Sequence, residues 1–485
     1  MNVASVIKQH YILLALLVLG AVLRFYELDF QSVWLDEINT LNDANPDYSI
    51  SEVFASVAKY DLHPPLYFFA IHFLFKLFGY TALVARAFSA VAGIAAIWAM
   101  YKLGRELFNK QVGLVTSALL CVNAYQIYYS QEARPYMVFC LFTILSFLYL
   151  ARFVKLPTRR NAILYGVFTS LMLYGHLFGL FTLVGQIAVI LFFIAVSEKS
   201  ERKPFFVNAV IAGVTAFVLF IPSAKSFYAA TLVNEFWIPK PTLQTFADIF
   251  SDFFGRSEII LLLTVTGIIF YLIRLSKEKR TGFTRESIVS NRMTFSSIIL
   301  ASWLVFTVVP PVVLSYVSTP MVIGRYFIAI LPAIFIVVAI GIEFKNRLIT
   351  VGVASIFLIV SLTDLAVSKY YSTVTKTQFR ELTPLIAANN KSEPIATSLA
   401  WYFQYFLPGE KIVDANLDKY VGQMIDNPAN AKSFWYVDAH DRPYHASAET
   451  EEFLKRHFVV TRQFEKYDIW AIHYSYKRQS TNENN

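Results

Sequence analysis

The strongest constraint on the fold of this chain is a series of apolar runs that fill most of its first 367 residues. Each run is about as long as the roughly 20 residues that an α-helix needs to cross a bilayer. The chain is 56% hydrophobic and 16% charged, whereas soluble domains average about 25% charged residues. The composition therefore excludes a wholly soluble protein and predicts a mostly α-helical, polytopic membrane protein. Eleven spans are expected, near residues 9–27, 85–104, 112–130, 135–153, 161–176, 177–197, 205–225, 257–274, 293–313, 326–344 and 347–367.

A further apolar stretch, residues 66–78, is too short to cross and contains His72 and Lys76. Its length predicts an interfacial helix. If it crossed, every later loop would change sides and the Lys and Arg clusters would face outward, against the positive-inside rule. We therefore expect the following segments to face outward: 28–84, 131–134, the turn at His176, 226–256, 314–325 and everything after 367.

The character of the chain changes after residue 367. Apolar stretches shorten to strand length, at 394–397, 411–414, 433–438 and 458–460, and helix-like stretches lie between them. Alternating strands and helices predict a small α/β domain. The expected organisation is a transmembrane domain over residues 1–367 and an extracytoplasmic α/β domain over 368–485, with a disordered end.

The formal charge of +8 does not indicate a nucleic-acid partner. Lys and Arg occur in short clusters between the apolar runs, which is the pattern of membrane orientation. The two cysteines, Cys121 and Cys140, lie inside apolar runs and lack metal-ligand spacing. A disulfide framework is therefore not expected.

Three polar clusters interrupt the apolar chain, and the span count places all of them on the outer face. They are Trp34-Leu35-Asp36-Glu37, Asp61-Leu62-His63-Pro64-Pro65, and Gln131-Glu132-Ala133-Arg134-Pro135-Tyr136. Because charged groups beside lipid are costly, their gathering at one membrane face indicates a functional site.

Asp36 and Glu37 have two interpretations. Adjacent carboxylates are often only solvated loop residues. Here they follow the aromatic residue Trp34 at membrane depth, where one carboxylate could serve as a general base and the other as a ligand for a metal or a sugar hydroxyl.

Asp61 and His63 precede the short helix expected over 66–78. Prolines and polar residues are common at helix starts, which explains Pro64 and Pro65. That explanation does not require both Asp61 and His63, which could also help to bind a metal or a phosphate.

Arg86, Arg134 and Arg325 lie at expected helix ends on the outer face. Such arginines either snorkel to lipid headgroups or offer a planar fork of donors to a phosphate. For Arg134, a local ion pair with Glu132 is the main alternative. His176, in a turn between two expected spans, is a residue type that is usually structural in such a place.

The order of these motifs resembles the membrane glycosyltransferases of the GT-C superfamily, in the branch of protein O-mannosyltransferases and the lipid A aminoarabinose transferase. The resemblance covers residues 10–200 and, more loosely, 300–345. The matching residues are Leu23-Arg24-Phe25-Tyr26, Trp34-Leu35-Asp36-Glu37, His63-Pro64-Pro65-Leu66, Arg86, Leu103-Gly104-Arg105-Glu106-Leu107-Phe108, Tyr129-Ser130-Gln131-Glu132-Ala133-Arg134-Pro135-Tyr136 and Gly324-Arg325-Tyr326.

The resemblance implies transfer of a sugar from a polyprenyl-phosphate carrier to an acceptor hydroxyl at the outer face of the cytoplasmic membrane. The acceptor would be a lipid, a polysaccharide or a protein. Asp36 would be the general base, Glu37 a supporting carboxylate, and arginines would bind the carrier phosphate. The expected substrate-binding residues are Asp61, His63, Arg86, Glu132, Arg134, Tyr136, His176, Arg325 and Tyr326.

This chain departs from the aminoarabinose transferases at one motif. That branch places a carboxylate directly before a Lys-Pro-Pro sequence, whereas this chain has Leu62 there, with Asp61 one position earlier and His63 in place of the lysine. A divalent metal ion is left open as a cofactor, with Asp36, Asp61 and His63 as candidate ligands.

Two other classes of function remain as alternatives. A transporter or flippase for a lipid-linked glycan would place polar residues near the bilayer midplane and often shows repeated halves, and neither feature is found in this sequence. A non-catalytic scaffold would leave the carboxylates at membrane depth unexplained.

Overall fold

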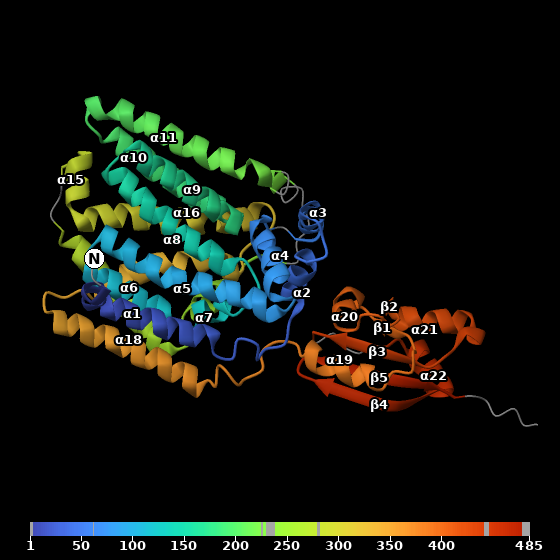
Figure 1. Cartoon of the computed structure of the whole chain (residues 1–485). Helices are drawn as coiled ribbons and strands as arrows, with labels where there is room; N and C mark the ends of the chain where they lie inside the picture. Colours follow the sequence, from blue (N-terminus) through green and yellow to red (C-terminus); the bar gives the residue numbers. More distant parts are fainter. Residues whose placement is uncertain are drawn as a thin grey trace, which may run out of the picture. The chain divides into compact units, whose positions relative to one another are not determined.

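The structure is a computed structural model, and it describes residues 3–61, 63–224, 227–228, 238–278, 282–440 and 446–477. Leu62 and the predicted disordered end beyond residue 477 therefore lie outside the described residues. The chain divides into two compact units (Figure 1). We call residues 1–28 and 43–371 the membrane unit, and residues 29–42 and 372–485 the C-terminal unit.

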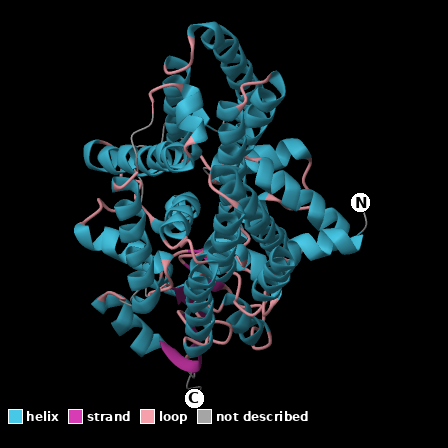
Figure 2. Cartoon of the chain, turned by 90° about the vertical axis from the view of Figure 1, so that its left-hand side faces the viewer, coloured by secondary structure: helices cyan, strands magenta, loops and turns pink. Residues whose placement is uncertain are grey.

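Among the described residues, seven helical segments of the membrane unit are long and apolar enough to cross a bilayer. They are α5 (Ala82–Leu107), α8 (Tyr136–Lys155), α11 with the short helix η1 (Lys199–Ser223), α14 (Glu258–Ser276), α16 (Arg292–Val317), η2 with α17 (Gly324–Gly341) and α18 (Arg347–Val367). The prediction of an integral, multi-pass membrane protein is confirmed. Figure 2, where strands are magenta, shows how strongly helices dominate the chain.

The expected number of eleven spans stays a prediction. The other four expected spans contain α1 (Val3–Phe25), α9 (Arg159–Gly175), α10 (Gly179–Ala195), and the pair α6 (Lys110–Val122) and α7 (Ala124–Ser130). The apolar part of α1, residues 11–25, and the 17 residues of α10 are shorter than a full span, and α6 and α7 form an eighth span only if the pair is counted as one.

A bend of 63° separates α6 from α7, where the sequence predicted one continuous span. Asn123 causes the break, because its side-chain oxygen accepts the N–H of Gln126 and so starts a new helix. Its amide nitrogen donates to the carbonyl of Phe253 over 2.8 Å. After the bend, α7 ends at Ser130, directly before the turn that carries Glu132 and Arg134.

A buried arginine holds this broken helix in place. Arg24 is fully buried at the end of α1 and donates to the hydroxyl of Ser130 on α7 and to the carbonyls of Leu120 and Cys121 on α6. The approach requires Gly93 on α5, because a Cβ there would lie 2.3 Å from the Ser130 hydroxyl.

Two short helices of the membrane unit, α3 (Ile50–Tyr60) and α4 (Leu66–Phe78), lie at one end of the bundle (Figure 1). The helix α4 has the bounds that the sequence predicted. On α4, Phe68 and His72 are buried, whereas Phe73 and Phe78 are exposed. An apolar face left outward suits an interfacial helix, although the depth of α4 in a bilayer stays a prediction.

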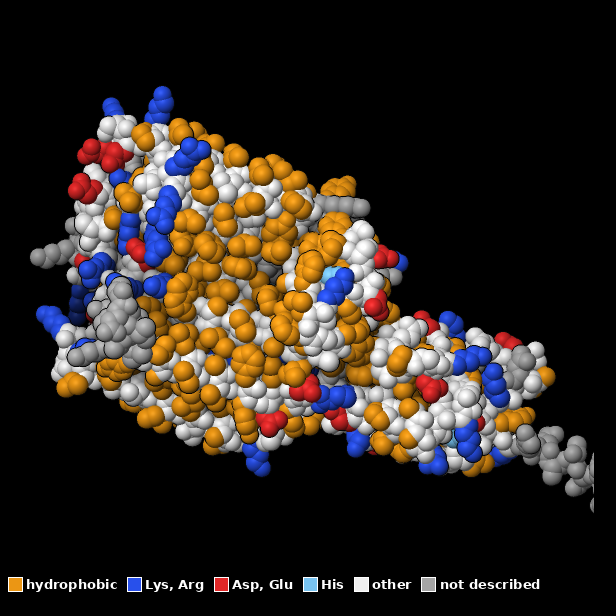
Figure 3. Space-filling model, in the orientation of Figure 1, with side chains coloured by type: hydrophobic (Ala, Val, Ile, Leu, Met, Phe, Trp, Pro, Cys, Tyr) orange, Lys and Arg blue, Asp and Glu red, His pale blue; other side chains and the backbone are white. Residues whose placement is uncertain are grey.

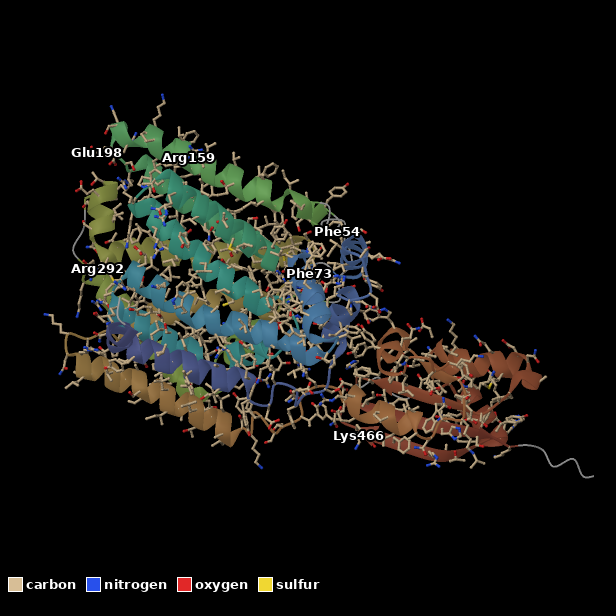
Figure 4. All side chains as sticks on the ribbon, viewed as in Figure 1. Phe54, Phe73, Arg159, Glu198, Arg292 and Lys466 are labelled. Atoms are coloured by element: carbon tan, nitrogen blue, oxygen red, sulfur yellow. The ribbon has the colours of Figure 1, made fainter. Side chains whose placement is uncertain are left out.

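The opposite end of the bundle carries many Lys and Arg side chains (Figure 3). Figure 4 shows Arg159, Glu198 and Arg292 at this end, and Phe54 of α3 and Phe73 of α4 at the other. Ion pairs also tie helices together there: Glu106 pairs with Arg152 and Lys155, and Arg274 pairs with Glu343. Two further helices of this unit lie within the described residues, α13 (Leu243–Phe253) and α15 (Arg285–Ser290).

The C-terminal unit contains a five-stranded mixed sheet with strand order β2-β1-β3-β5-β4. The strands are β1 (Ile395–Thr397), β2 (Ile412–Asp414), β3 (Phe434–Ala439), β4 (Phe458–Lys466) and β5 (Ile469–Tyr476). The pairs β1–β2 and β1–β3 are parallel, and β3–β5 and β5–β4 are antiparallel. The prediction of a small α/β domain in this region is confirmed.

Helices pack on both faces of the sheet, and each face has its own hydrophobic core. One core joins Phe379 of α19 (Phe379–Ala387), Phe403 of α20 (Ala400–Phe406) and Trp435. The other joins Val421 of α21 (Leu417–Asp426), Leu454 of α22 (Ala448–His457) and Phe434. Neighbouring residues of β3 thus point to opposite faces of the sheet. The short helix η3 (Pro428–Asn430) precedes β3.

Residues 29–42 are part of the C-terminal unit although they lie far from it in sequence. Arg380 donates to the carbonyls of Asp29 and Phe30, and its backbone N–H donates to the Ser32 hydroxyl. Leu35 packs on the core that contains Phe379. The helix α2 (Leu35–Asp43) thus begins in the C-terminal unit, and its last residue belongs to the membrane unit.

Candidate functional site

A buried polar cluster of the membrane unit contains Asp61, His63, Arg134 and His176, all at least nine-tenths buried. Asp61 follows α3, His63 precedes α4, Arg134 lies between α7 and α8, and His176 ends α9. Three of the predicted outer loops therefore supply one site, which we call the polar cluster.

Asp61 contacts two other members of this cluster, Arg134 and His63. Its Oδ2 accepts a hydrogen bond from Arg134 Nη1 over 2.8 Å, and its Oδ1 contacts His63 Nδ1. Burial alone would raise the pKa of Asp61, but the charges of Arg134 and His63 outweigh it and hold that pKa below its ordinary value. Asp61 is therefore ionised, and Arg134 is the buried partner that keeps it so.

His63 is oriented by this carboxylate. Contact between Nδ1 and Asp61 Oδ1 requires the ring proton to sit on Nδ1. Arg134 Nη2 also lies 3.1 Å from this nitrogen, but a protonated Nδ1 cannot accept its hydrogen, so we treat that approach as a charge contact. In the neutral ring, Nε2 then carries the lone pair.

His176 has the opposite tautomer. Its Nδ1 accepts the backbone N–H of Phe178 over 3.1 Å, so its proton sits on Nε2. Burial, followed by the positive charges of His63 and Arg134, lowers the pKa of His176 well below its ordinary value. The ring is therefore neutral, and its Nε2 is a hydrogen-bond donor.

Aromatic rings pack the two histidines together. The ring centroid of His176 lies 4.9 Å from that of His63, 4.6 Å from that of Tyr326 and 6.1 Å from that of Tyr136. Within the part of the chain that the structure describes, neither His63 Nε2 nor His176 Nε2 has a hydrogen-bond partner. Buried polar atoms rarely remain unpaired in native proteins, so these two ring nitrogens are available to a ligand.

Arg325 and Tyr326 belong to the same region. They begin η2 (Gly324–Ile330), and the Arg325 guanidinium lies 5.9 Å from the ring centroid of Tyr326. The charge of Arg325 contributes to the low pKa of His176. The structure thus brings Arg325, predicted from the sequence alone, to the polar cluster.

Three other residues predicted for the site have the following contacts. Glu132 is buried beside Arg134, and its carbonyl accepts the Arg134 backbone N–H. Arg86, fully buried on α5, donates to the carbonyl of Leu28 over 3.2 Å. Tyr136 is buried at the start of α8.

Asp36 and Glu37 belong to the C-terminal unit. They occupy the first turn of α2, where a negative charge is favoured by the helix dipole. Glu37 is fully buried and forms an ion pair with Lys376 over 3.3 Å, whereas Asp36 is only half-buried. Lys376 Nζ also lies 5.7 Å from the ring centroid of Trp34. The sequence contained no signal for Lys376.

Asp43 is a further buried carboxylate that the sequence did not predict. It is fully buried in the membrane unit, and Ser56 donates to its Oδ1 over 2.5 Å. Its Oδ2 has no partner among the described residues. Burial raises the pKa of Asp43 to about 7. A single aspartate in a polar helix looks like a surface residue in sequence, so no pattern could have identified it.

A metal site needs several His, Cys, Asp or Glu side chains close together. Among the described residues, no group of three or more His, Cys, Asp or Glu side chains is placed to hold a metal ion. Asp61 is committed to Arg134 and His63. His63 donates from Nδ1 to Asp61, which is the arrangement in which a histidine ligates a metal through Nε2, but no group of three suitable side chains lies around it among the described residues. The third candidate ligand, Asp36, belongs to the C-terminal unit. The described residues therefore do not assemble a metal site around Asp61 and His63.

A family model described as dolichyl-phosphate-mannose-protein mannosyltransferase matches residues 62–225. A comparison with curated proteins found no match.

Among solved structures, ArnT from Cupriavidus metallidurans bound to undecaprenyl phosphate is similar with a TM-score of 0.61 and 11% identity, over 95% of this chain and 97% of that one. The oligosaccharyltransferase AglB from Archaeoglobus fulgidus, in complex with an inhibitory peptide and a dolichol-phosphate, is similar with a TM-score of 0.55 and 10% identity, over 99% of this chain and 75% of that one. At such identities the likeness shows the fold. The resemblance of this chain to the membrane glycosyltransferases of the GT-C superfamily, first indicated by its motifs, is thus confirmed by a family model and by the fold of nearly the whole chain.

Proposed function

We propose that this protein transfers a sugar from a polyprenyl-phosphate carrier to an acceptor hydroxyl at the outer face of the cytoplasmic membrane. The observation that carries the proposal is the polar cluster, where Arg134 and two histidines lie buried at the end of an apolar bundle. The similar structures of ArnT and AglB contain undecaprenyl phosphate and a dolichol-phosphate, respectively. A lipid carrier presents its phosphate at the depth where such a cluster would meet it.

The leaving group of this reaction is a phosphate, which needs positive charge and hydrogen-bond donors. Arg134 and Arg325 supply cations, and His176 supplies an Nε2–H donor that has no partner among the described residues. Because these groups are already held by packing, they stabilise the developing charge without reorganising. Asp61 fixes the orientation of Arg134, so that its remaining donors face a constant direction.

The acceptor hydroxyl needs a base. We assign this role to Asp36, which is half-buried at the start of α2. As the acceptor oxygen bonds to the anomeric carbon, the bond from that carbon to the phosphate oxygen breaks, and the hydroxyl proton passes to Asp36. General-base catalysis of this kind contributes about 10²–10⁴ in rate. Glu37, held by Lys376, fixes the first turn of α2.

The proposed topology follows from the same reasoning. The basic end of the bundle would face the cytoplasm, and the end that carries α3 and α4 would face outward (Figure 4). The C-terminal unit would then be extracytoplasmic, as the sequence predicted.

Reconstitution tests the proposal. The purified full-length protein in liposomes would be incubated with radiolabelled polyprenyl-phosphate sugars and with lipid, polysaccharide and peptide acceptors. A labelled acceptor formed by the wild type, and not by the Arg134→Ala variant, supports the proposal. Movement of intact carrier across the liposome bilayer without any labelled acceptor would instead indicate a flippase.

A further inference from the structure

The motif Leu23-Arg24-Phe25-Tyr26 has no role in the chemistry proposed above, yet its arginine is fully buried. Arg24 lies in the last turn of α1, and α1 packs against α5, α6 and α7 (Figure 1). A charged side chain among membrane helices is costly and usually serves a function. The partners of Arg24 indicate what that function is.

These partners lie on both sides of the break between α6 and α7. The last carbonyls of a helix have no intrahelical donor, and the bend at Asn123 creates such a helix end inside the bundle. Arg24 donates from Nη1 to the carbonyl of Cys121 over 3.0 Å and from Nη2 to that of Leu120 over 3.2 Å. Its Nε donates over 3.1 Å to the hydroxyl of Ser130, the last residue of α7. One guanidinium thus fixes the angle between the two helices.

The Ser130 hydroxyl is oriented to accept this hydrogen bond. Its own proton is donated to the carbonyl of Gln126 over 2.6 Å, so the oxygen presents a lone pair to Arg24. A Cβ at Gly93 on α5 would lie 2.8 Å from Arg24 Nε and 2.3 Å from Ser130 Oγ. The contact therefore depends on the absence of a side chain at this position of α5.

Gln131 makes a second link between α1 and the residues that follow α7. Its amide nitrogen donates to the backbone carbonyls of Arg24 over 3.3 Å and of Tyr26 over 3.0 Å. Its amide oxygen accepts the hydroxyl of Tyr370, which follows α18, over 3.1 Å. We call Arg24, Ser130, Gln131 and Tyr370 the α1 clamp.

The α1 clamp ends three residues before Arg134. The turn between them is tight, since the Arg134 backbone N–H donates to the carbonyl of Glu132 over 2.8 Å. Beyond the turn, the Ser89 hydroxyl donates to the Arg134 carbonyl over 3.3 Å, and Asp61 holds the guanidinium. The clamp therefore fixes the start of a short turn whose end carries the proposed phosphate ligand.

We propose that Arg24 is a positioning residue for the phosphate site: through Ser130 and Gln131 it sets where the Arg134 guanidinium meets the carrier phosphate. The inference rests on the proposed function, because it takes Arg134 as a phosphate ligand. A displacement of about 1 Å far from the chemistry can cost about 10²-fold in rate, so a residue that does not touch the carrier can control its binding. The competing explanation is that Arg24 only satisfies carbonyls of α6 and stabilises the fold.

Conservative variants and a double-mutant cycle test the proposal. The affinity for undecaprenyl phosphate and the melting temperature would be measured on the purified full-length protein. Ser130→Ala removes the acceptor of Arg24 Nε, and Tyr370→Phe releases Gln131. Each should weaken the affinity about threefold or more, because residues of one hydrogen-bond network usually couple at this level. In an Arg134→Ala background, Ser130→Ala should weaken it no further, because its effect passes through Arg134.

Arg24 itself is tested by two replacements. Lysine keeps a charged donor but lacks the planar fork that reaches both sides of the break, whereas methionine keeps only the apolar stem. Arg24→Lys should therefore bind the carrier less tightly than the wild type and more tightly than Arg24→Met. Ser130→Ala and Tyr370→Phe decide the matter if Arg24→Met does not fold.

Matched controls lie at the basic end of the bundle. Ser296 on α16 is buried and donates to the carbonyl four residues earlier over 2.7 Å, as Ser130 does to Gln126. Tyr271 on α14 donates its hydroxyl to Ser297 over 2.7 Å. Ser296→Ala and Tyr271→Phe should lower the melting temperature about as much as the clamp variants and leave the carrier affinity unchanged.

Each outcome decides between the two explanations. If Arg134→Ala weakens carrier binding but the clamp variants match their controls, Arg24 serves only the fold, and the inference is overturned while the proposed function stands. The same holds if the effects of Ser130→Ala and Arg134→Ala simply add. If the wild type binds no carrier, or if Arg134→Ala leaves the affinity unchanged, the proposed phosphate site and the inference fall together.

Discussion

Arg134 and Asp61 form a buried ion pair over 2.8 Å between residues that lie 73 positions apart in the chain. Each belongs to a different loop at the same end of the helical bundle, and the pair holds these loops together. Taking one partner from a buried pair leaves an uncompensated charge, which costs about 3–5 kcal/mol. The pair is thus both a structural link and the frame of the proposed phosphate site.

The arginines of this region should control carrier binding. We predict that Arg134→Ala and Arg325→Ala each weaken the affinity for undecaprenyl phosphate by at least about tenfold, since a charge-assisted hydrogen bond contributes about 1.5–3 kcal/mol. Lysine should restore only part of it, because the bidentate fork is lost. Arg86→Ala should have a smaller effect, because Arg86 donates to the Leu28 carbonyl. Carrier affinity and thermal stability would be measured for each variant, and unchanged affinity in all three would place the carrier phosphate elsewhere.

Asp43 should make stability depend on pH. Its pKa is raised to about 7 by burial, against about 3.9 in an unfolded chain. A carboxyl group with a raised pKa contributes stability that is fully present below its unfolded pKa and is lost as the pH rises through its folded pKa. The wild type should therefore lose stability between about pH 4 and pH 8, and Asp43→Asn should flatten this loss.

The measurement for Asp43 is the melting temperature across this pH range. A shift of about three pKa units corresponds to roughly 4 kcal/mol, of which we expect a part. Asp47→Asn is the matched control, since Asp47 is exposed and its replacement should leave the profile unchanged. Identical profiles for the wild type and Asp43→Asn would show that Asp43 is already ionised at neutral pH.

Lys376 should stabilise the C-terminal unit through its ion pair with the buried Glu37 carboxylate. Lys376→Gln leaves the fully buried Glu37 carboxylate without its cation and should cost about 3–5 kcal/mol. Glu37→Gln in the same chain should recover most of the loss. Lys455→Gln, which breaks an exposed pair with Glu451, should cost less than about 1 kcal/mol. Equal losses for the two lysine variants would argue against a buried pair at Glu37.

Topology can be tested with introduced cysteines, because Cys121 and Cys140 are both buried. A cysteine in place of the exposed Ser392 should react with an impermeant thiol reagent on intact cells, and one in place of Ser287 should not. Ser32 is expected on the same side as Ser392 but is buried, so a cysteine there would not report on topology. Labelling only at Ser287 would reverse the proposed orientation. A cysteine at Asn234, which lies outside the described residues, should also react.

The sequence predicts the helices better than it predicts the contacts between them. The bounds of α4 follow from its apolarity and length. Four of the five described strands of the C-terminal unit overlap short apolar stretches that the sequence predicted, whereas β5 was not predicted. The bend at Asn123 was missed, because one polar residue inside an apolar run does not interrupt the hydropathy of a span. Here a single side chain caps a new helix, which hydropathy does not detect.

For the candidate site, the sequence likewise predicts where residues lie but not which of them interact. The span count places Asp61, Arg134 and Arg325 at one end of the bundle, but which of them pair is decided by packing. Lys376 meets Glu37 across 339 residues, and no local pattern encodes such a contact. Asp43 owes its properties to burial, which its polar neighbours in α2 conceal.

The most direct test of the account is sugar transfer by the Asp36→Asn variant, with carrier affinity measured on the same preparation. If Asp36 is the general base, transfer should fall by about 10²–10⁴ while carrier affinity and melting temperature stay at wild-type values. Glu37→Gln should leave more residual activity. Wild-type turnover by a folded Asp36→Asn variant would contradict the assignment of Asp36 and the mechanism built on it.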